Sequence, residues 1–265
     1  MTSLADILAQ IRPNQTQQLI QFPEGWGQGR ALFGGLTAAA IARFIQQQGL
    51  ADVPMRSITV SFVAPVAAGE AELGFRLLRQ GKAVTQVAAE ISQQGQVVLS
   101  ALASLGAGRP SSIAVEQEPC AELGDKAQGM ALPEMDVVPE FAKHFDYRIT
   151  RGGIPYTGQN ERDFGGWIRL KDADKPVTVP TILALVDAWP PALLPHLKQP
   201  APASSLTWTI EFLDRDLSHF SGADWWQYQA IIEHAENGYG HCRATLWDAQ
   251  GQLVALSRQT VTVFG

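Results

Sequence analysis

Alternating apolar and polar residues recur in two distant stretches of the chain. Residues 57–65 read SITVSFVAP and residues 205–213 read SLTWTIEFL, and both have the two-residue period of a half-buried strand. A longer strand-like segment with two turn signals follows each stretch. These signals are RQGK (79–82) and QQGQ (93–96) in the first half, and ENGY (236–239) and AQGQ (249–252) in the second. Because Asn-Gly and similar pairs are typical of β-hairpins, the pattern predicts antiparallel strands in both halves.

One apolar helix is predicted ahead of each set of strands. Residues 34–48 are rich in alanine and are followed by Gly49, whereas residues 179–189 are followed by Pro190 and Pro191, which end or kink a helix. Helix, strand, hairpin and strand recur in one order at matching spacing, so we interpret the chain as an internal duplication. A lone apolar helix becomes buried when a sheet curls around it. We therefore predict an α+β fold of two tandem repeats, each with a long helix wrapped by a curved antiparallel sheet.

The segment between the halves has neither period and is rich in Gly, Pro, Ser and acidic residues. We predict a first unit over residues 1–108, a linker over 109–140 with one short helix, and a second unit over 141–265. The second unit is expected to begin with strands near 144–150 and 165–170.

Composition, net charge and cysteine content exclude several classes of protein. Of the 265 residues, 46% are hydrophobic and 17% are charged, as in a folded globular protein, and the net charge of −6 disfavours nucleic acid and anionic membranes as partners. The two cysteines, Cys120 and Cys242, form neither a disulfide framework nor a zinc motif. The first twenty residues lack a signal-peptide pattern, and no apolar run is long enough to span a membrane. We expect a soluble cytoplasmic protein with no metal, no cofactor, no nucleic-acid partner and no membrane contact.

Asp187 is the residue whose chemistry stands out. It lies in the apolar run ILALVDAWPPALL, and no Lys or Arg occurs between residues 177 and 197. A carboxylate on an apolar helix costs several kcal/mol unless it is satisfied, so its presence indicates a functional role. The alternative is that Asp187 caps a second helix that begins at Pro190.

The ordered series of segments resembles the acyl-CoA thioesterase II family, whose fold is the double hotdog. The segments are Trp26 with GQGRALFGGLTAAAI (27–41), SITVSFVAP, LRQGKAVTQVAAEI (78–91), LVDAWPPALLPH (185–196), SSLTWTIEF (204–212) and GQLVALSRQ (251–259). The resemblance covers nearly the whole chain except the linker. It implies hydrolysis of acyl-CoA thioesters to the free acid and CoA, within fatty acid metabolism.

The resemblance also implies a catalytic set. Carried over by position, the family's carboxylate is Asp187, its hydroxyl is Ser205 and its glutamine is Gln259. The three would activate and hold one water, with Asp187 as the proton acceptor. Serine stands here where a relative has threonine, and Thr207 is the alternative hydroxyl if the strand register differs. Plain alternation would place Ser205, Thr207 and Thr209 on one face of their strand.

Two glycines are expected to bind the substrate, and two alanines indicate that the first half lacks a catalytic set of its own. Gly34 and Gly35 open the first-half helix, whose free N–H groups would stabilise the developing oxyanion, as helix N-termini do for thioesters in related folds. A tight turn is the alternative role for this pair. When the halves are aligned, Ala39 and Ala103 stand where the second half has its carboxylate and its glutamine. We therefore expect one hydrolytic set per chain.

The charges are unevenly distributed between the halves. Residues 1–109 hold eight Lys/Arg and six Asp/Glu, whereas residues 110–265 hold twelve and twenty. We expect the CoA phosphates to meet the first half or the linker. The candidate cations are Arg30, Arg56, Arg79, Lys82 and Arg109.

Two other functions stay open on the same fold. An enoyl-thioester hydratase typically needs an Asp–His pair, and no histidine lies near a matching motif. A non-catalytic acyl-thioester binder is the second alternative. Hotdog units pair through edge strands, so assembly into a homodimer or a higher homo-oligomer is expected.

Overall fold

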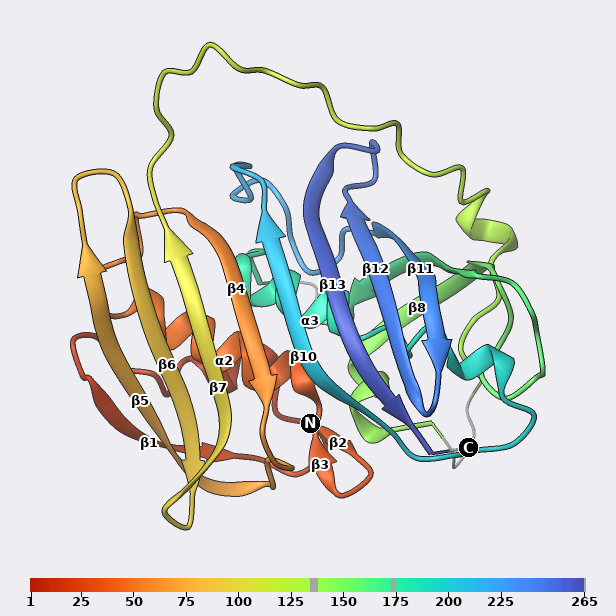
Figure 1. Cartoon of the computed structure of the whole chain (residues 1–265), viewed down its shortest axis with the longest axis horizontal. Helices are drawn as coiled ribbons and strands as arrows, with labels where there is room; N and C mark the ends of the chain where they lie inside the picture. Colours follow the sequence, from red (N-terminus) through yellow and green to blue (C-terminus); the bar gives the residue numbers. More distant parts are fainter. Residues whose placement is uncertain (134–137, 173–174, 265) are drawn as a thin grey trace.

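One antiparallel sheet of 11 strands runs through both halves of the chain. The computed structural model describes residues 1–133, 138–172 and 175–264, and its sheet curves around the main helices (Figure 1). In order across the sheet the strands are β1 (Gln17–Phe22), β5 (Gly69–Gln80), β6 (Thr85–Gln93), β7 (Gln96–Leu105), β4 (Met55–Phe62), β10 (Ala203–Phe212), β13 (Leu253–Val263), β12 (Tyr239–Trp247), β11 (Trp226–Glu236), β9 (Asp163–Leu170) and β8 (Phe145–Arg151).

The two halves meet where β4 pairs with β10, the two stretches that alternate alike in the sequence. Val60 is paired with Trp208 at the middle of this contact, and residues 57–61 run opposite residues 211–207. Outward from this pair the order is β7, β6 and β5 on one side, and β13, β12 and β11 on the other. The strands that follow each repeated stretch are therefore arranged alike on the two sides of the sheet.

The hairpins form where the turn signals predict them. Asn237 and Gly238 have φ angles of 52° and 80°, and they join β11 to β12 as a two-residue turn. Gln94 and Gly95, with φ angles of 52° and 76°, join β6 to β7 in the same way. Positive φ at both central residues is the condition for a turn that matches the twist of the flanking strands.

The long helix of the first half is α2 (Gly34–Gln46), and it is buried along most of its length. Its central alanines, residues 38–40, have no exposed surface, and such small side chains let α3 (Val179–Asp187) pack against it. α3 has only 9 residues, so the prediction of a long helix in each repeat is not confirmed for the second half. It ends early because Trp189 precedes a proline, which disfavours helical backbone at that residue.

The structure also decides the capping alternative for Asp187. The next helical turn, η3 (Leu194–His196), follows Leu193 and has no side-chain cap. Asp187 is instead the last residue of α3. The hypothesis that Asp187 caps a second helix starting at Pro190 is therefore wrong.

Several short elements lie outside the main sheet and the two main helices. They are α1 (Leu4–Leu8), β2 (Gly27–Gln28), β3 (Ala31–Leu32), η1 (Lys126–Gln128) and η2 (Glu140–His144). The chain leaves β7 and passes along the upper edge of the sheet to the second half (Figure 1). There the side chain of Gln117 accepts from the Leu253 N–H at 2.8 Å and donates to the Gly251 carbonyl at 2.9 Å. The predicted linker includes residues 134–137, which lie outside the described residues, and its bounds stay a prediction.

The predicted strands near 144–150 and 165–170 are β8 and β9. Among the helices of the described residues, none combines the length and the apolar character needed to cross a membrane.

Candidate active site

Asp187 faces the beginning of the other main helix. A Cβ atom on Gly34 would lie 2.8 Å from Asp187 Oδ2, and one on Gly35 would lie 3.0 Å from Asp187 Cβ. The first distance is shorter than real Cβ contacts and the second lies at their lower limit, so glycine at both positions allows the N-terminus of α2 to approach the carboxylate. The structure thus brings Gly34 and Gly35 together with Asp187.

Gln259 connects the carboxylate to the sheet. It lies on β13 between Trp208 of β10 and Cys242 of β12 in the pairing register. Its Nε2 donates to Ser205 Oγ at 2.8 Å and to Asp187 Oδ1 at 3.3 Å. The three residues predicted as a catalytic set therefore converge from α3, β10 and β13.

A β-bulge decides which hydroxyl takes part. Ser205 pairs with Val261 and Thr207 pairs with Thr260, so β10 carries one extra residue at this point. Such a bulge re-aims a side chain, and here it turns Ser205 toward the inner face of the sheet. The prediction that Ser205 shares a face with Thr207 and Thr209 is therefore wrong.

The alternative hydroxyl lies on the other face. Thr207 is exposed, and its neighbour two residues on, Thr209, has its hydroxyl 3.0 Å from that of Thr59 across the outer surface of the sheet. Of the two candidates, Ser205 is the one whose hydroxyl meets Gln259.

Burial sets the protonation of Asp187. The side chain keeps some accessible surface but lies deep in the protein, and this desolvation raises its pKa to about 7. The Gly35 backbone N–H and the Gln259 amide act in the opposite direction, because they stabilise the ionised form. Among the described residues no Lys or Arg forms an ion pair with Asp187. A carboxyl group that titrates near neutral pH suits proton transfer.

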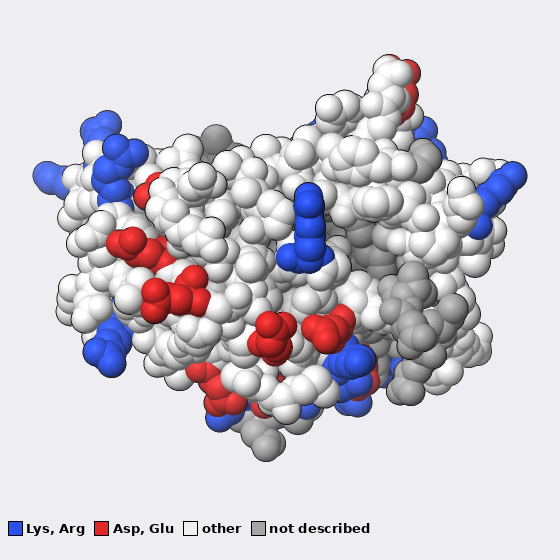
Figure 2. All heavy atoms as spheres, turned by 90° about the horizontal axis from the view of Figure 1, so that it is seen from below, with Lys and Arg blue, Asp and Glu red and all other residues white. Residues whose placement is uncertain are grey.

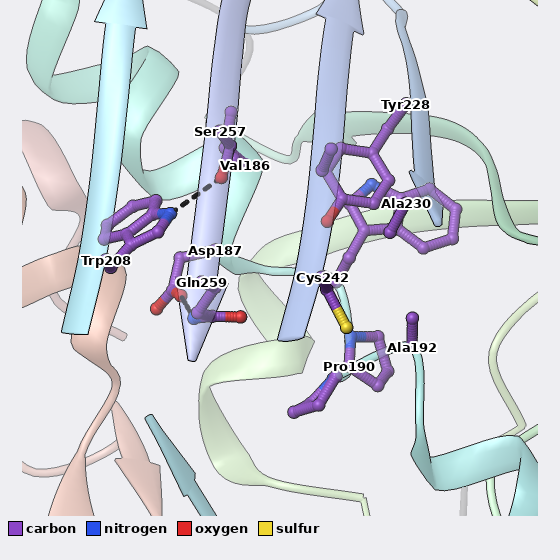
Figure 3. Close-up of a pocket in the computed structure, with 13 residues that line it drawn as sticks. Val186, Asp187, Pro190, Ala192, Trp208, Tyr228, Ala230, Cys242, Ser257 and Gln259 are labelled. Atoms are coloured by element: carbon purple, nitrogen blue, oxygen red, sulfur yellow. Dashed lines mark hydrogen bonds between the residues drawn. The ribbon is translucent and has the colours of Figure 1, made fainter. Parts of the chain in front are cut away.

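A small cavity lies beside the carboxylate (Figure 3). It is enclosed by the end of α3, the segment that follows it, and the inner faces of four strands. The lining residues are Val186, Asp187, Trp189, Pro190, Pro191, Ala192, Trp208, Tyr228, Ala230, Cys242, Ala244, Ser257 and Gln259. Its free volume is ≈ 10 Å³, which is about what one water molecule needs.

Sequence reasoning missed the aromatic lining of this cavity. Trp189, Trp208 and Tyr228 are all buried, and the Trp208 indole donates to Ser257 Oγ at 2.9 Å. Their local pattern marks them as inward-facing residues, and it does not separate cavity lining from ordinary core. Cys242, interpreted from the sequence as a core residue, is buried here, and burial raises its pKa to about 11. It is therefore a thiol at neutral pH rather than a nucleophilic thiolate.

The candidate cations for CoA phosphates are divided between the two ends of the sheet. Arg56, at the start of β4, lies beside the end of β10 and pairs with Asp214 at 2.8 Å. Arg79 and Lys82 of the β5–β6 turn and Arg109 lie at this same end, which is opposite to Ser205.

Of the five candidate cations, Arg30, between β2 and β3, is the one that lies at the end of the sheet that Ser205 and Gln259 occupy (Figure 1). Figure 2 views the molecule from this end, where separate basic and acidic groups are scattered over a mostly uncharged surface. A continuous basic patch does not cover the face in this view. Within the described residues, no group of three or more His, Cys, Asp and Glu side chains is arranged to hold a metal ion.

Two family models match the chain. The model of the acyl-CoA thioesterase N-terminal domain matches residues 22–106, and the model of the acyl-CoA thioesterase C-terminal domain matches residues 118–263. A comparison with curated proteins finds no match.

Solved structures resemble the chain over its whole length. A conserved protein of unknown function with a hot dog fold from Alicyclobacillus acidocaldarius has 21% identity and a TM-score of 0.88, with 100% of this chain and 99% of that chain covered. A putative thioesterase II from Thermobifida fusca has 20% identity and a TM-score of 0.79, with 100% and 98% covered. An acyl-CoA thioesterase II from Mycobacterium marinum has 17% identity and a TM-score of 0.77, with 99% and 98% covered. At these identities the likeness shows the fold, which is a hotdog fold with a large antiparallel sheet.

Proposed function

Because the chain belongs to the acyl-CoA thioesterase family and is a thioesterase, we propose that it hydrolyses acyl-CoA to the free acid and CoA with a water activated by Asp187. The observation that carries this proposal is that Gln259 bonds both Ser205 and Asp187, while Asp187 and Gln259 line one small cavity. The three side chains come from elements far apart in the sequence, and the cavity beside them has room for about one water.

Asp187 would act as the general base. With a pKa of about 7 it is largely ionised in mildly alkaline solution and still basic enough to accept a proton from the attacking water. A thioester carbonyl is electrophilic and a thiolate leaves readily, so the reaction needs no covalent nucleophile. The nearby Cys242 is a thiol, which agrees with direct attack by water.

Ser205 and Gln259 would hold the water in place. The Gln259 amide nitrogen is used by Ser205 and Asp187, which leaves its carbonyl oxygen to accept from a water. The Ser205 oxygen accepts from Gln259, so its own O–H is left to donate. A water held by both groups has a fixed orientation toward the carbonyl carbon, which lowers the entropic barrier to attack.

The first turn of α2 would stabilise the oxyanion. Backbone N–H groups and the positive end of the helix dipole both favour negative charge at this position. Because the Gly35 N–H donates to Asp187, we assign the contact with the substrate carbonyl oxygen to the N–H of Gly34 at the same turn.

The first half of the chain would not hold a second set. Ala39 and Ala103, which stand at the positions of the carboxylate and the glutamine, have 0% and 2% exposure and pack in the core. We therefore propose one catalytic site per chain. The two bounded units, the assembly into a homo-oligomer and the cytoplasmic location stay predictions.

Thiol release tests the proposal. Acyl-CoA is mixed with the protein and free CoA is trapped with a thiol reagent, while the enoyl absorbance of an enoyl-CoA is followed in parallel. We expect thiol release by the wild type and a loss of at least a hundredfold in kcat for Asp187→Asn. A change in enoyl absorbance without release of free thiol would indicate a hydratase. Binding of acyl-CoA with neither change would indicate a non-catalytic acyl-thioester binder. Turnover of Asp187→Asn within a few-fold of the wild type would refute the role of Asp187.

A further inference from the structure

Four of the five candidate cations lie at the end of the sheet opposite to Ser205, and the proposed reaction leaves them without a role. A second cavity lies at this end, which is the upper edge of the sheet in Figure 1, where β7 and β10 end. Its volume is ≈ 450 Å³, which is within the range of small-molecule sites. The lining includes Arg56, Val84, Ser104, Leu105, Arg109 and Asp214.

This cavity lies at the first-half counterpart of the catalytic end of the second half. β10 carries one extra residue directly after Ser205. β4 carries one extra residue in the same place, and this residue is Arg56, directly after Met55. Two residues beyond each bulge residue, β10 pairs with Gln259, whereas β4 pairs with Ala103. The first half thus keeps the bulge but has Met55 and Ala103 in place of the hydroxyl and the amide, so a ligand held here meets no matching catalytic set.

Arg56 is a donor with a fixed orientation at this cavity. Its Nε donates to the Gly106 carbonyl at 2.6 Å and its Nη2 donates to Asp214 Oδ2 at 2.8 Å. A guanidinium group has five N–H donors, so three are left without a partner among the described residues. A guanidinium held in this way can offer two parallel N–H groups to the oxygens of a phosphate.

The charges around the cavity favour an anion. Asp214 is the one carboxylate among the lining residues, and Arg56 already neutralises it. Arg109 is exposed and forms no ion pair with a carboxylate in the part of the chain that the structure describes. The β5–β6 turn, which carries Lys82, packs against Gly106 at the cavity wall. Positive charge therefore exceeds negative charge at this end of the sheet.

Apolar side chains line another part of the wall. Val84 is 42% exposed, and Leu105 is buried beneath the cavity. Small-molecule sites typically combine such apolar surface with a few fixed polar groups. A phosphate ion alone would use the arginines but would leave the apolar wall and most of the volume to water. A nucleoside phosphate uses both, because its phosphate suits the arginines and its base covers the exposed valine.

We propose that this cavity binds a nucleoside phosphate, with its phosphate on Arg56 and Arg109 and its base against Val84. CoA and free adenine nucleotides share this chemistry. The site is separate from the catalytic set, because Ser205 and Phe212, near the two ends of β10, are about 23 Å apart at strand spacing. The inference therefore does not rest on the proposed function.

Direct binding tests the inference. Adenosine diphosphate (ADP) is titrated into the wild type by isothermal titration calorimetry, with inorganic phosphate and adenosine as partial ligands. We expect one ADP per chain with a Kd below about 1 mM, and each partial ligand to bind at least about tenfold more weakly. The absence of measurable ADP binding, or equal binding of ADP and inorganic phosphate, would overturn the inference.

Three arginine variants locate the bound ADP. Arg109→Ala and Arg56→Ala should each weaken ADP binding by about tenfold, because each removes a charged donor to the phosphate. Arg243→Ala is the matched control, since it removes an exposed cation from β12 in the other half, and its Kd should stay within about twofold of the wild type. Equal loss in Arg109→Ala and Arg243→Ala would indicate non-specific attraction, and no loss in Arg109→Ala would place ADP elsewhere. If Arg56→Ala does not fold, the exposed Arg109 decides.

Competition experiments separate the two sources of the ligand and the two sites. CoA that displaces ADP below the Kd of ADP itself identifies CoA as the preferred ligand, whereas weaker displacement identifies the free nucleotide, and either result supports the site. In the thiol-release assay, saturating ADP should not act as a competitive inhibitor of acyl-CoA. Competitive inhibition would mean that these cations hold the CoA of the substrate, and the separate site would be wrong. A wild type that binds ADP but releases no thiol contradicts only the proposed function.

Discussion

The side-chain amide of Gln259 lies 3.3 Å from Asp187 Oδ1, although 72 residues separate the two along the chain. This contact joins the end of α3 to the sheet, and it favours the ionised form of a carboxyl group that burial would otherwise keep protonated. Gln259 therefore acts on the basicity of Asp187 as well as on the position of the water.

Removing this contact should shift the pH dependence of catalysis. We expect the kcat/KM of the wild type to rise with pH through a pKa near 7, as the Asp187 carboxyl loses its proton. In Gln259→Ala the pKa of Asp187 should be higher, because a hydrogen bond that lowers it is lost, so the rising limb should move to higher pH. The measurement is a pH–rate profile with an acyl-CoA substrate. If the pKa of the pH–rate profile is the same in Gln259→Ala as in the wild type, the Gln259 hydrogen bond does not lower the pKa of Asp187.

The buried carboxyl group should also make stability depend on pH. Between the unfolded pKa of 3.8 and the folded pKa of about 7, the folded chain holds a proton that the unfolded chain has released. Stability from this group is therefore complete below pH 3.8 and is lost as pH rises to about 7, by a total on the order of 4 kcal/mol. Above pH 7 the loss is constant.

Asp187→Asn isolates this contribution, since asparagine does not titrate. Urea denaturation of both proteins at pH 5 and pH 8 should show the wild type losing stability relative to the variant as pH rises. At pH 8 we expect the inactive variant to be the more stable protein. Parallel stabilities of the two proteins at both pH values would show that Asp187 has an ordinary pKa.

A bulge that turns one hydroxyl inward predicts different effects for neighbouring substitutions. Ser205→Ala removes the oxygen that accepts from Gln259, so kcat should fall by roughly tenfold to a hundredfold. Thr207→Ala removes an exposed hydroxyl from the outer face of the same strand, and kcat should stay within twofold of the wild type. Comparing kcat for the two variants checks the register directly. A larger loss in Thr207→Ala than in Ser205→Ala would exchange their roles.

The approach of α2 to Asp187 should not tolerate a methyl group. In Gly34→Ala the new Cβ would lie 2.8 Å from Asp187 Oδ2 and 3.0 Å from Phe62, so the carboxylate must move and kcat should fall at least tenfold. Gly108→Ala is a matched control, because its Cβ would meet only Asp214 at an ordinary 3.5 Å. Steady-state kinetics of both variants, with circular dichroism as a check on folding, make the comparison. Full activity in Gly34→Ala would exclude a tight packing requirement at this position.

Several features could be predicted from the sequence because their causes are local. The two-residue alternation of 57–65 and 205–213 predicts the central strands, and Asn237-Gly238 predicts the tight turn between β11 and β12. The absence of cations from 177 to 197 is enough to mark Asp187 as an unusual carboxyl group. In each case the signal lies within about twenty residues of the feature that it predicts.

Other features depend on contacts between distant parts of the chain. Alternation alone places Ser205 on the wrong face, because the bulge exists only in the pairing of β10 with β13. Tyr228, which lines the cavity, has the same alternating pattern as any core strand residue, and the candidate cations are divided between the two ends of the sheet by a topology that the sequence does not state. Local periodicity and turn chemistry thus determined the central strands and their turns, and the local absence of cations marked Asp187 as an unusual acid. The tertiary structure decided which side chains meet it, because strand register is set by pairing over more than fifty residues of chain.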